Sequence, residues 1–182
     1  MRRRGWVVRD KPIAHDHPIG LLTSKSGPGS VFAEATENLA SMAVEEINAD
    51  GGMNGRRLRL VVGDDSTDSS VGAVEARRLA RAGCRVILAT TTSAAFARAT
   101  EELRGANVLL IHTLLNEGGL GAELVVQLGE RPQGQLRAAA SPMMRMTGGR
   151  RSFLVGDDYC WPPGVPRRRR AGDRARGRHD RR

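Results

Sequence analysis

Small hydroxyl-bearing side chains gather in two short segments of this chain, and both segments could hold a small polar molecule. One is the serine- and glycine-rich segment Thr23–Ser30, and the other is Thr90–Ser93. Hydroxyls and free backbone N–H groups at a helix start can bind a carboxylate or an amide. The composition equally fits ordinary strand-to-helix loops, in which these residues only cap a helix. The candidate ligand-binding residues are Ser24, Ser26, Thr91, Thr92 and Ser93.

The acidic pair Asp64-Asp65 directly follows an apolar run and has two possible chemistries. It fits a phosphoacceptor pocket or a carboxylate pair that binds a metal ion, but it also fits plain capping of the next segment. Capping is favoured, because the only lysines are Lys11 and Lys25 and none follows the pair as a phosphoacceptor site would need.

Histidines give weaker signals. His15-Asp16-His17 has metal-ligand residue types, but no second cluster accompanies it, so no metal site is predicted. His112 closes an apolar run, where its ring could face a crevice at the end of a strand or simply make a core hydrogen bond.

The signatures of common enzymes are missing from the sequence. There is no Gly-x-Ser-x-Gly elbow, no Gly-Lys dipeptide of a phosphate loop and no Gly-x-Gly-x-x-Gly after an apolar run. No nucleophile stands with a base and an orienting group. The sequence therefore predicts a binding protein without cofactor or metal. An α/β enzyme with an unrecognised site is the less favoured alternative.

Strand and helix patterns alternate from Ile19 onward, which predicts an α/β fold with a parallel sheet and helices on both faces. The predicted strands are 19–22, 58–65, 86–89, 108–111, 124–128 and 152–156. The predicted helices are 30–49, 69–82, 94–104 and 133–146, the last kinked or shortened at Pro142.

Two of these helices carry a recognisable apolar face. The stripe on the first comprises Phe32, Ala35, Leu39, Met42, Ala43 and Ile47, at steps of three and four residues. Ser30 is the expected cap of this helix, and Gly51 or Gly52 its left-handed end. The inner face of the second helix is predicted to consist of Val71, Val74, Leu79 and Ala82.

The net charge of +9 is concentrated at the two ends of the chain. Residues 167–182 carry +7 and residues 1–11 carry +4, which leaves −2 for residues 12–166. Without aromatic residues interleaved among the arginines, no specific nucleic-acid partner is predicted. The two cysteines, Cys84 and Cys160, exclude a disulfide framework. No apolar run is long enough to span a membrane, and a signal peptide is not recognisable, so a cytoplasmic location is expected.

Residues 19–161 resemble the type 1 periplasmic-binding-protein superfamily, whose fold is that of the branched-chain amino-acid binding proteins. The most specific matches are the turn Asp50-Gly51-Gly52 with Asn54-Gly55 and the step Gly156-Asp157-Asp158-Tyr159. Others are Thr92-Ser93-Ala94, Asn116-Glu117-Gly118 and the run 128–133. Within the superfamily, the sequence is most similar to the branch that binds urea and short aliphatic amides.

The resemblance implies two α/β lobes on a hinge that close on a small polar solute, and an ABC permease as partner of the intact parent. It implies solute contacts at Thr91, Thr92, Ser93, His112, Leu114 and Tyr159. His112 and Leu114 stand where the amide-binding branch has an aromatic hydroxyl and a hydroxyl.

The same resemblance divides the chain into four parts. These are an irregular leader (1–17), one Rossmann-like ligand-binding lobe (18–132), the start of an incomplete second lobe (133–161) and a disordered Arg-rich tail (162–182). The expected function is binding of a small polar solute (an amide, urea or an amino acid) for an ABC-type uptake system, by a truncated fragment that is non-functional or binds weakly. A cytoplasmic amide sensor of the same fold is the alternative. We expect a frameshift or a misassigned end where the tail begins, which sequencing of the gene would test.

Overall fold

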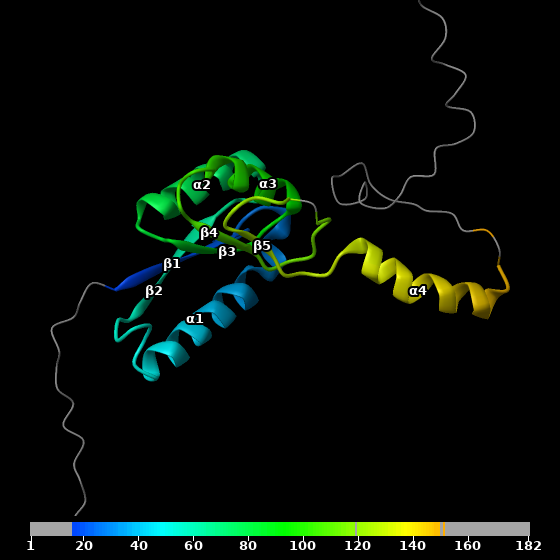
Figure 1. Ribbon diagram of the computed structural model, residues 1–182, viewed down its shortest axis with the longest axis horizontal. Helices are drawn as coiled ribbons and strands as arrows, with labels where there is room; N and C mark the ends of the chain where they lie inside the picture. Colours follow the sequence, from blue (N-terminus) through cyan, green and yellow to red (C-terminus); the bar gives the residue numbers. More distant parts are fainter. Residues whose placement is uncertain (1–15, 119, 150, 152–182) are drawn as a thin grey trace, which may run out of the picture. The chain divides into compact units, whose positions relative to one another are not determined.

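The computed structural model describes residues 16–118, 120–149 and 151. Its centre is a parallel sheet in the order β2-β1-β3-β4-β5 (Figure 1). The strands are β1 (His17–Thr23), β2 (Leu58–Asp64), β3 (Val86–Thr90), β4 (Leu109–His112) and β5 (Val125–Gln127). The helices are η1 (Pro28–Phe32), α1 (Ala33–Ala49), α2 (Ser69–Arg81), α3 (Ser93–Glu102) and α4 (Pro132–Thr147). The predicted α/β class is confirmed.

The strand order explains why helices lie on both faces of the sheet. The chain moves from β1 to β2 in one direction and then returns past β1 to β3, β4 and β5. Right-handed crossovers then require α1 on one face and α2 and α3 on the other (Figure 1). The reversal lies between β1 and β3, and ligands of such sheets bind beside this point, at the carboxyl ends of the strands.

The chain forms two compact units. The first comprises residues 1–115 and 119–129 and contains the sheet with α1, α2 and α3. The second comprises residues 116–118 and 130–182, and α4 is its described helix. The predicted strand 152–156, Tyr159, residues 1–15 of the leader and the Arg-rich tail lie outside the described residues.

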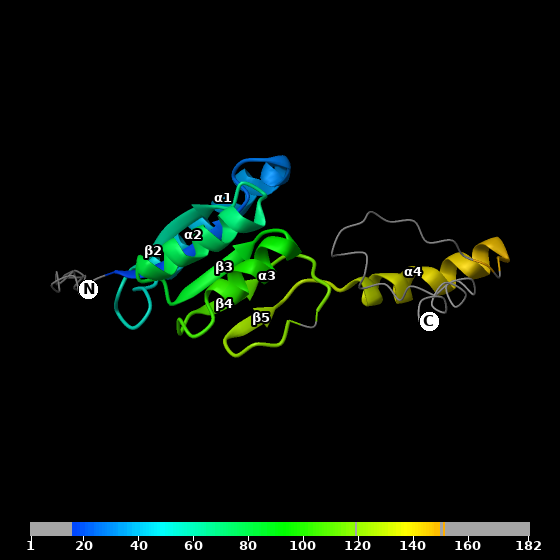
Figure 2. The same cartoon turned by 90° about the horizontal axis from the view of Figure 1, so that it is seen from above.

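The core lies between the sheet and the helices α2 and α3 (Figure 2). Leu22, Ile87 and Leu110 project from three neighbouring strands toward Leu79 and Phe96, and all five side chains are buried. Close packing of this kind stabilises the fold both by removing apolar surface from water and by dispersion contacts.

The predicted inner face of α2 is wrong in part. Leu79 is buried, but Val71, Val74 and Ala82 are exposed. The remaining buried residues of α2 are Gly72, Ala73 and Ala76. The reason is the short distance at which α2 packs: a Cβ at Gly72 would lie 3.3 Å from the Cβ atoms of Asp65 and Ala95. Small residues permit this approach, so the branched side chains turn outward.

The first helix also differs from its prediction. The segment Pro28–Phe32 forms the 3-10 helix η1, so that α1 begins at Ala33, and Phe32 at its N-cap gives no side-chain cap. The predicted cap by Ser30 is therefore wrong. Gly51 and Gly52 do end the helix with positive φ, at 98° and 75°. The apolar stripe is present, but no residue of α1 is buried.

In the second unit, α4 runs without interruption through Pro142 and ends at Gly148, whose φ is 61°. The predicted shortening at Pro142 is therefore wrong. Among the residues of α4, only Pro132 is buried.

Candidate functional site

The two hydroxyl-bearing loops meet at one edge of the sheet. Thr23, the last residue of β1, is paired with Asp64 of β2 and with Thr90 of β3, so the three parallel strands end level with one another. The loops that follow β1 and β3 therefore leave the same edge, on either side of the reversal in strand order. Their predicted convergence is confirmed.

Asp65 joins the two loops at this edge. Its side chain is fully buried and accepts hydrogen bonds from the hydroxyls of Thr91 and Ser24 and from the backbone N–H of Thr67, the last at 2.8 Å. Burial raises the pKa of Asp65, an effect that the hydrogen bonds from Ser24 and Thr67 partly oppose. The buried hydroxyls of Ser24 and Thr91 are thus already engaged with a carboxylate of the protein.

Asp64 organises the exposed part of the β1–α1 loop. Its Oδ1 accepts from the backbone N–H groups of Lys25, Ser26 and Ser66 at 2.8, 3.2 and 2.8 Å, and its Oδ2 from the Ser26 hydroxyl at 2.7 Å. Burial would raise the pKa of Asp64, but these hydrogen bonds outweigh it and lower the pKa. Ser26 therefore supports the shape of its own loop through this carboxylate.

A further clamp holds the β1–α1 loop against the segment that follows β2. Thr67 Oγ1 accepts from the N–H of Gly29 at 2.9 Å and donates to the carbonyl of Ser26 at 3.0 Å. Gly27 has a φ of 76°, and a Cβ there would lie 2.4 Å from the carbonyl oxygen of Ser66. The loop composition thus reflects a close approach of two backbones as well as any ligand contact.

Helix capping explains part of the second loop. Thr92 is the N-cap of α3, and its hydroxyl accepts from the N–H of Ala95 at 3.2 Å; Ser93 is the first residue of this helix. Asp68, rather than Asp64 or Asp65, caps α2 by accepting from the N–H groups of Ser70 and Val71 at 2.7 and 3.0 Å. The acidic pair therefore does not cap α2, although Asp64 and Asp65 accept from the N–H groups of Ser66 and Thr67 in the segment that directly follows.

His112 and Leu114 occupy different environments. The His112 ring is fully buried, stacks on Phe96 with 4.2 Å between the ring centroids, and its Nε2 lies 3.1 Å from the Thr91 carbonyl oxygen. It thus lies under α3, on the face of the sheet that α2 and α3 cover. Leu114 follows β4 and is half-buried, and its carbonyl is so close to Gly129 that a Cβ there would lie 1.8 Å from the oxygen. Tyr159 lies outside the described residues.

The structure adds one pair that sequence reasoning did not select. The hydroxyls of Thr90 and Thr113 are 2.8 Å apart, at the ends of the adjacent strands β3 and β4. Thr113 is exposed, and its hydroxyl also donates to the Ala89 carbonyl at 3.2 Å. The sequence could have indicated this pair, because a threonine stands shortly after each of the consecutive predicted strands 86–89 and 108–111. These hydroxyls lie beside Asp65 and its hydrogen-bond partners, at the same edge of the sheet.

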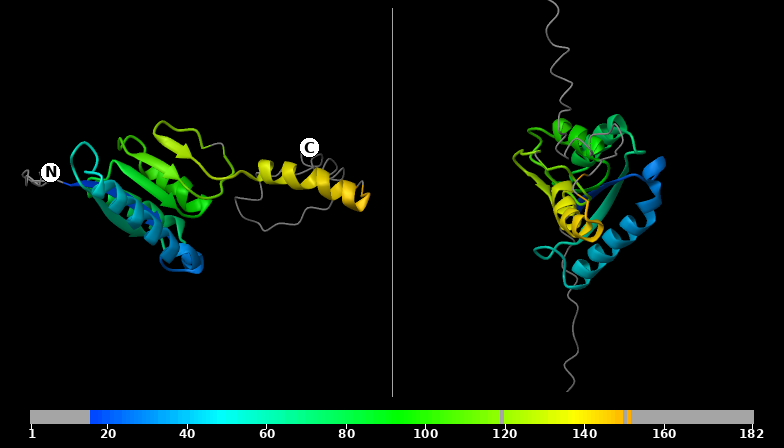
Figure 3. Two further views of the ribbon diagram at one scale, coloured as in Figure 1. Left: turned by 90° about the horizontal axis from the view of Figure 1, so that it is seen from below. Right: turned by 90° about the vertical axis from the view of Figure 1, so that its right-hand side faces the viewer.

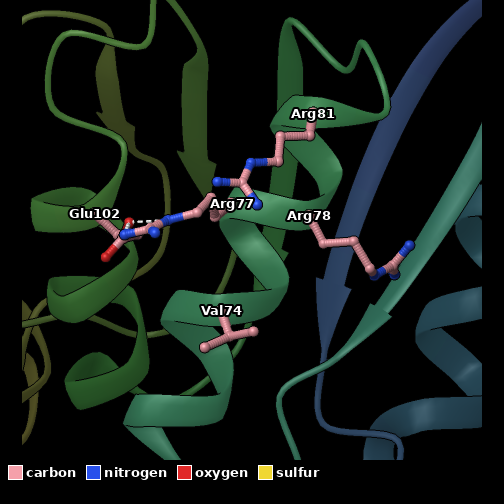
Figure 4. Close-up of a pocket in the computed structure, with 5 residues that line it drawn as sticks. All are labelled: Val74, Arg77, Arg78, Arg81 and Glu102. Atoms are coloured by element: carbon pink, nitrogen blue, oxygen red, sulfur yellow. Dashed lines mark hydrogen bonds and ion pairs between the residues drawn. The ribbon is translucent and has the colours of Figure 1, made fainter.

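Surface hollows occur away from this edge. One is lined by Val74, Arg77, Arg78 and Arg81 of α2 with Glu102 of α3 (Figure 4). Arg77 pairs with Glu102, and Arg78 bonds to Glu75 and to the Val62 carbonyl. Because α2 runs back from the carboxyl edge, these arginines lie toward the opposite edge. A second hollow lies between the end of α3 and β5. Neither hollow is lined by a predicted site residue.

The part of the chain that the structure describes contains neither a candidate metal site nor a helix that could span a membrane. Residues 16–118, 120–149 and 151 contain no group of three or more histidine, cysteine, aspartate or glutamate side chains placed to hold a metal ion. Across the same residues, each helix is too short or too polar to cross a bilayer. Cys84 is a free, buried cysteine whose pKa is raised by that burial.

Comparison with known proteins gives a consistent picture. The family model described as "Periplasmic binding protein" matches residues 17–167. A Leu/Ile/Val-binding protein, BraC3, of Rhizobium johnstonii is 27% identical over 158 residues, which are 85% of this chain and 43% of the relative. The Leu/Ile/Val-binding protein of Escherichia coli is 23% identical over the same shares. The chain thus spans less than half the length of these curated relatives.

Solved structures agree. The branched-chain amino acid transporter substrate-binding protein LivJ of Streptococcus pneumoniae, in complex with isoleucine, matches with a TM-score of 0.51 and 28% identity, over 53% of this chain and 28% of that one. A leucine-, isoleucine-, valine-, threonine- and alanine-binding protein of Brucella ovis in a closed conformation matches with a TM-score of 0.66. The two sequences are 21% identical, and the match covers 84% of this chain and 42% of the Brucella protein. At this identity the match supports the fold alone.

The sheet order, the loops at its carboxyl edge and the family match over most of the chain lead to one conclusion. The family consists of binding proteins that act in the periplasm, not of enzymes. This chain belongs to the periplasmic binding protein family.

Proposed function

We propose that this chain supplies one wall of an amino-acid binding cleft in the solute-binding component of an ABC-type uptake system. The observation that supports the proposal most directly is the edge formed by the Thr90–Thr113 pair and the start of α3, next to the reversal in strand order. Two hydroxyls and the positive end of a helix dipole suit the carboxylate of an amino acid. The relatives named as Leu/Ile/Val-binding proteins favour an aliphatic amino acid over an amide or urea.

In this proposal the predicted residues divide into two groups. Ser24, Ser26 and Thr91 are positioning residues, because their hydroxyls bond to Asp64 and Asp65. The buried His112 supports Thr91 from below through the contact of its Nε2 with the Thr91 carbonyl. The solute contacts then fall to Thr90, Thr113 and the start of α3 at Thr92 and Ser93, with Leu114 beside them. Tyr159 stays a prediction.

One wall of the cleft by itself is expected to bind an amino acid weakly. Small-molecule sites bury most of their ligand, and one open edge leaves much of an amino acid in water. In a longer parent protein a second lobe would close over this edge, as a shift between open and closed populations. Docking on an ABC permease belongs to that same proposal. A cytoplasmic location, which is expected from the sequence, would instead fit the alternative of a cytoplasmic sensor, and cell fractionation would check it.

Titration by ¹⁵N-resolved NMR tests the ligand and the site together, because it detects millimolar binding. We expect L-leucine to shift the amide signals of Thr90, Ser93 and Thr113, and acetamide and urea to shift them less. Thr113→Val removes one hydroxyl at constant shape and should weaken the leucine shifts. Thr36→Val is the matched control, because the Thr36 hydroxyl bonds to the Phe32 carbonyl within its own helical segment.

Three results would count against the proposal. Shifts confined to residues away from the carboxyl edge would remove the site. Equal responses to leucine and urea would remove the amino-acid preference. Micromolar binding by the isolated chain, measured by calorimetry, would contradict the single-wall argument.

A further inference from the structure

The sheet ends on one side at β2, a strand that is long enough to pair with a strand of another molecule. It has seven residues, whereas β5 at the other end of the sheet has three, and in the described sheet β1 is its one neighbour. Its sequence, Leu-Arg-Leu-Val-Val-Gly-Asp, is rich in branched apolar residues. An unpaired strand of this kind presents a row of N–H and C=O groups to which another chain can bind.

Alternate residues of β2 direct their backbone groups away from β1. The Arg57 carbonyl accepts from the N–H of His17 at 2.8 Å, and the N–H of Asp65 donates to the Thr23 carbonyl at 3.1 Å, so Arg57 and Asp65 both face β1. In a parallel strand the N–H and C=O of one residue point to the same side, and the side alternates along the chain. Between positions 58 and 63, the residues that face outward are Leu58, Leu60 and Val62, and their backbone groups are here called the outer edge of β2.

Asn48 occupies the first position of this outer edge. Its Oδ1 accepts from the N–H of Leu58 at 2.7 Å, and its Nδ2 donates to the carbonyl of the same residue at 2.9 Å. The carboxamide thus makes both hydrogen bonds that a neighbouring strand would make with Leu58. Asn48 belongs to the last turn of α1, which lies on the face of the sheet opposite α2 (Figure 3).

Arg78 occupies the third position and comes from α2, on the other face of the sheet. Its Nη2 donates to the Val62 carbonyl at 2.7 Å, and its Nε and Nη2 also bond to Glu75 Oε2 at 2.9 and 2.8 Å. Gly63 makes room for this arrangement, because a Cβ there would lie 3.0 Å from the Glu75 carboxylate. Arg78 and its neighbour Arg77 extend from α2 in opposite directions (Figure 4). A charged group at a strand edge opposes pairing with another strand.

The groups left between these two side chains are few. Within the described residues, the outward N–H and C=O of Leu60 and the N–H of Val62 have no hydrogen-bond partner. We propose that Asn48 and Arg78 close the outer edge of β2 against pairing with β2 of a second copy of this chain. A second copy is the partner whose edge matches, because two identical strands can pair antiparallel about a two-fold axis. The proposal does not depend on the proposed solute or on the proposed cleft.

Arg78→Met tests the proposal, because it keeps most of the side-chain length and removes the donor that covers the Val62 carbonyl. Arg77→Met is the matched control. The Arg77 side chain is 53% exposed against 48% for Arg78, and it pairs with Glu102 of α3 instead of with the strand. Each variant loses one positive charge and one ion pair, so the two differ in what happens at the outer edge of β2. Circular dichroism should show both variants folded, because both arginines are exposed.

Two measurements on the full 182-residue chain report the result. Sedimentation velocity over a concentration series detects association, and amide hydrogen exchange followed by NMR identifies the edge that is used. In the parent chain we expect the N–H of Leu60 to exchange faster than that of Leu58, which Asn48 covers, at a rate that does not depend on protein concentration. In Arg78→Met we expect dimers, and exchange at Leu60 that slows by roughly 5-fold as the concentration rises.

A loss of stability cannot imitate this result, because a less stable fold exchanges its amides faster. Exchange at Leu60 that stays independent of concentration in Arg78→Met would overturn the proposal. Equal protection of Leu60 in Arg77→Met would also overturn it, since the lost charge and not the opened edge would then control association. Protection of Leu60 that rises with concentration in the parent chain would do the same, because the edge would already be open.

Discussion

The two faces of the sheet are covered in different ways. On one face, α2 and α3 bring Leu79, Ala76 and Phe96 into a core in which these side chains are fully buried. On the other, α1 lies over β1 and β2 without a single buried residue and leaves Phe32 and Leu39 mostly exposed. The first face therefore carries most of the stability of the first unit.

The difference follows from residue size at the contact. Gly72, Ala73 and Ala76 let α2 approach the sheet closely, so the larger side chains of both layers interdigitate. On α1 the large apolar side chains Leu39, Met42 and Ile47 are exposed. A pair of matched substitutions, one on each face, can therefore measure how unequal the two faces are.

The largest expected difference compares two phenylalanines. Phe96→Ala should lower the free energy of unfolding by about 3–5 kcal/mol, because it leaves a cavity in the core and removes the stacking partner of His112. Phe32→Ala should cost less than about 1 kcal/mol, because that ring is exposed. Urea unfolding followed by circular dichroism measures both values. Equal losses would mean that the two faces do not differ in stability.

Overpacking gives the second comparison. Ala76→Leu inserts a large side chain where α2 packs on the core, and should destabilise the fold by about 1–3 kcal/mol. Ala43→Leu adds the same atoms on the exposed side of α1 and should stay within about 0.5 kcal/mol of the parent. Thermal unfolding of both variants checks the prediction, and a tolerated Ala76→Leu would show that the core is loosely packed.

Asp65 lies at the edge where the loops of both faces meet. Its contribution to the free energy of unfolding is expected to depend on pH. Asp65→Asn should cost about 1–2 kcal/mol at neutral pH, because Ser24, Thr67 and Thr91 lose part of their acceptor. Burial raises the pKa of Asp65 in the folded protein above its value in the unfolded chain. The stabilisation that follows from this shift is therefore fully present at a pH below the unfolded pKa, and it is lost as the pH rises through the folded pKa. The difference in free energy of unfolding between the parent and the Asp65→Asn variant should thus widen as the pH falls. A gap that narrows on acidification would contradict the burial argument.

The smallest effects concern the helix starts on the two faces. Asp68 caps α2, and hydrogen bonds from Ser70 and Val71 lower its pKa. Its contribution is therefore present above the unfolded pKa and lost as the pH falls through the folded value. Asp68→Ala should lower the urea midpoint slightly at pH 7 and not at strongly acidic pH. Ser30→Ala should have no effect at either pH, because no side chain caps α1. Asp68→Asn, which keeps a capping oxygen, is the control.

Much of the fold could be predicted from local pattern. The alternation of apolar runs and helical stripes predicted the order of the described strands and helices, and Gly51 and Gly52 mark a real chain reversal with positive φ. The hydroxyl-rich composition of Thr23–Ser30 and Thr90–Ser93 indicated which loops would meet. Periodicity did not reveal that Val71 and Val74 face outward, because that depends on how closely α2 packs against neighbours distant in sequence.

The amino-acid sequence by itself determined the class of the fold, the parallel sheet and the edge at which the two hydroxyl-bearing loops meet, since these follow from residue period and from the handedness of crossovers. Only the tertiary structure decided what each polar side chain does at that edge. Asp65 reaches Thr91 across 26 positions of sequence, and Thr90 meets Thr113 across 23. Such contacts depend on strand register, which brings together residues that no local pattern relates.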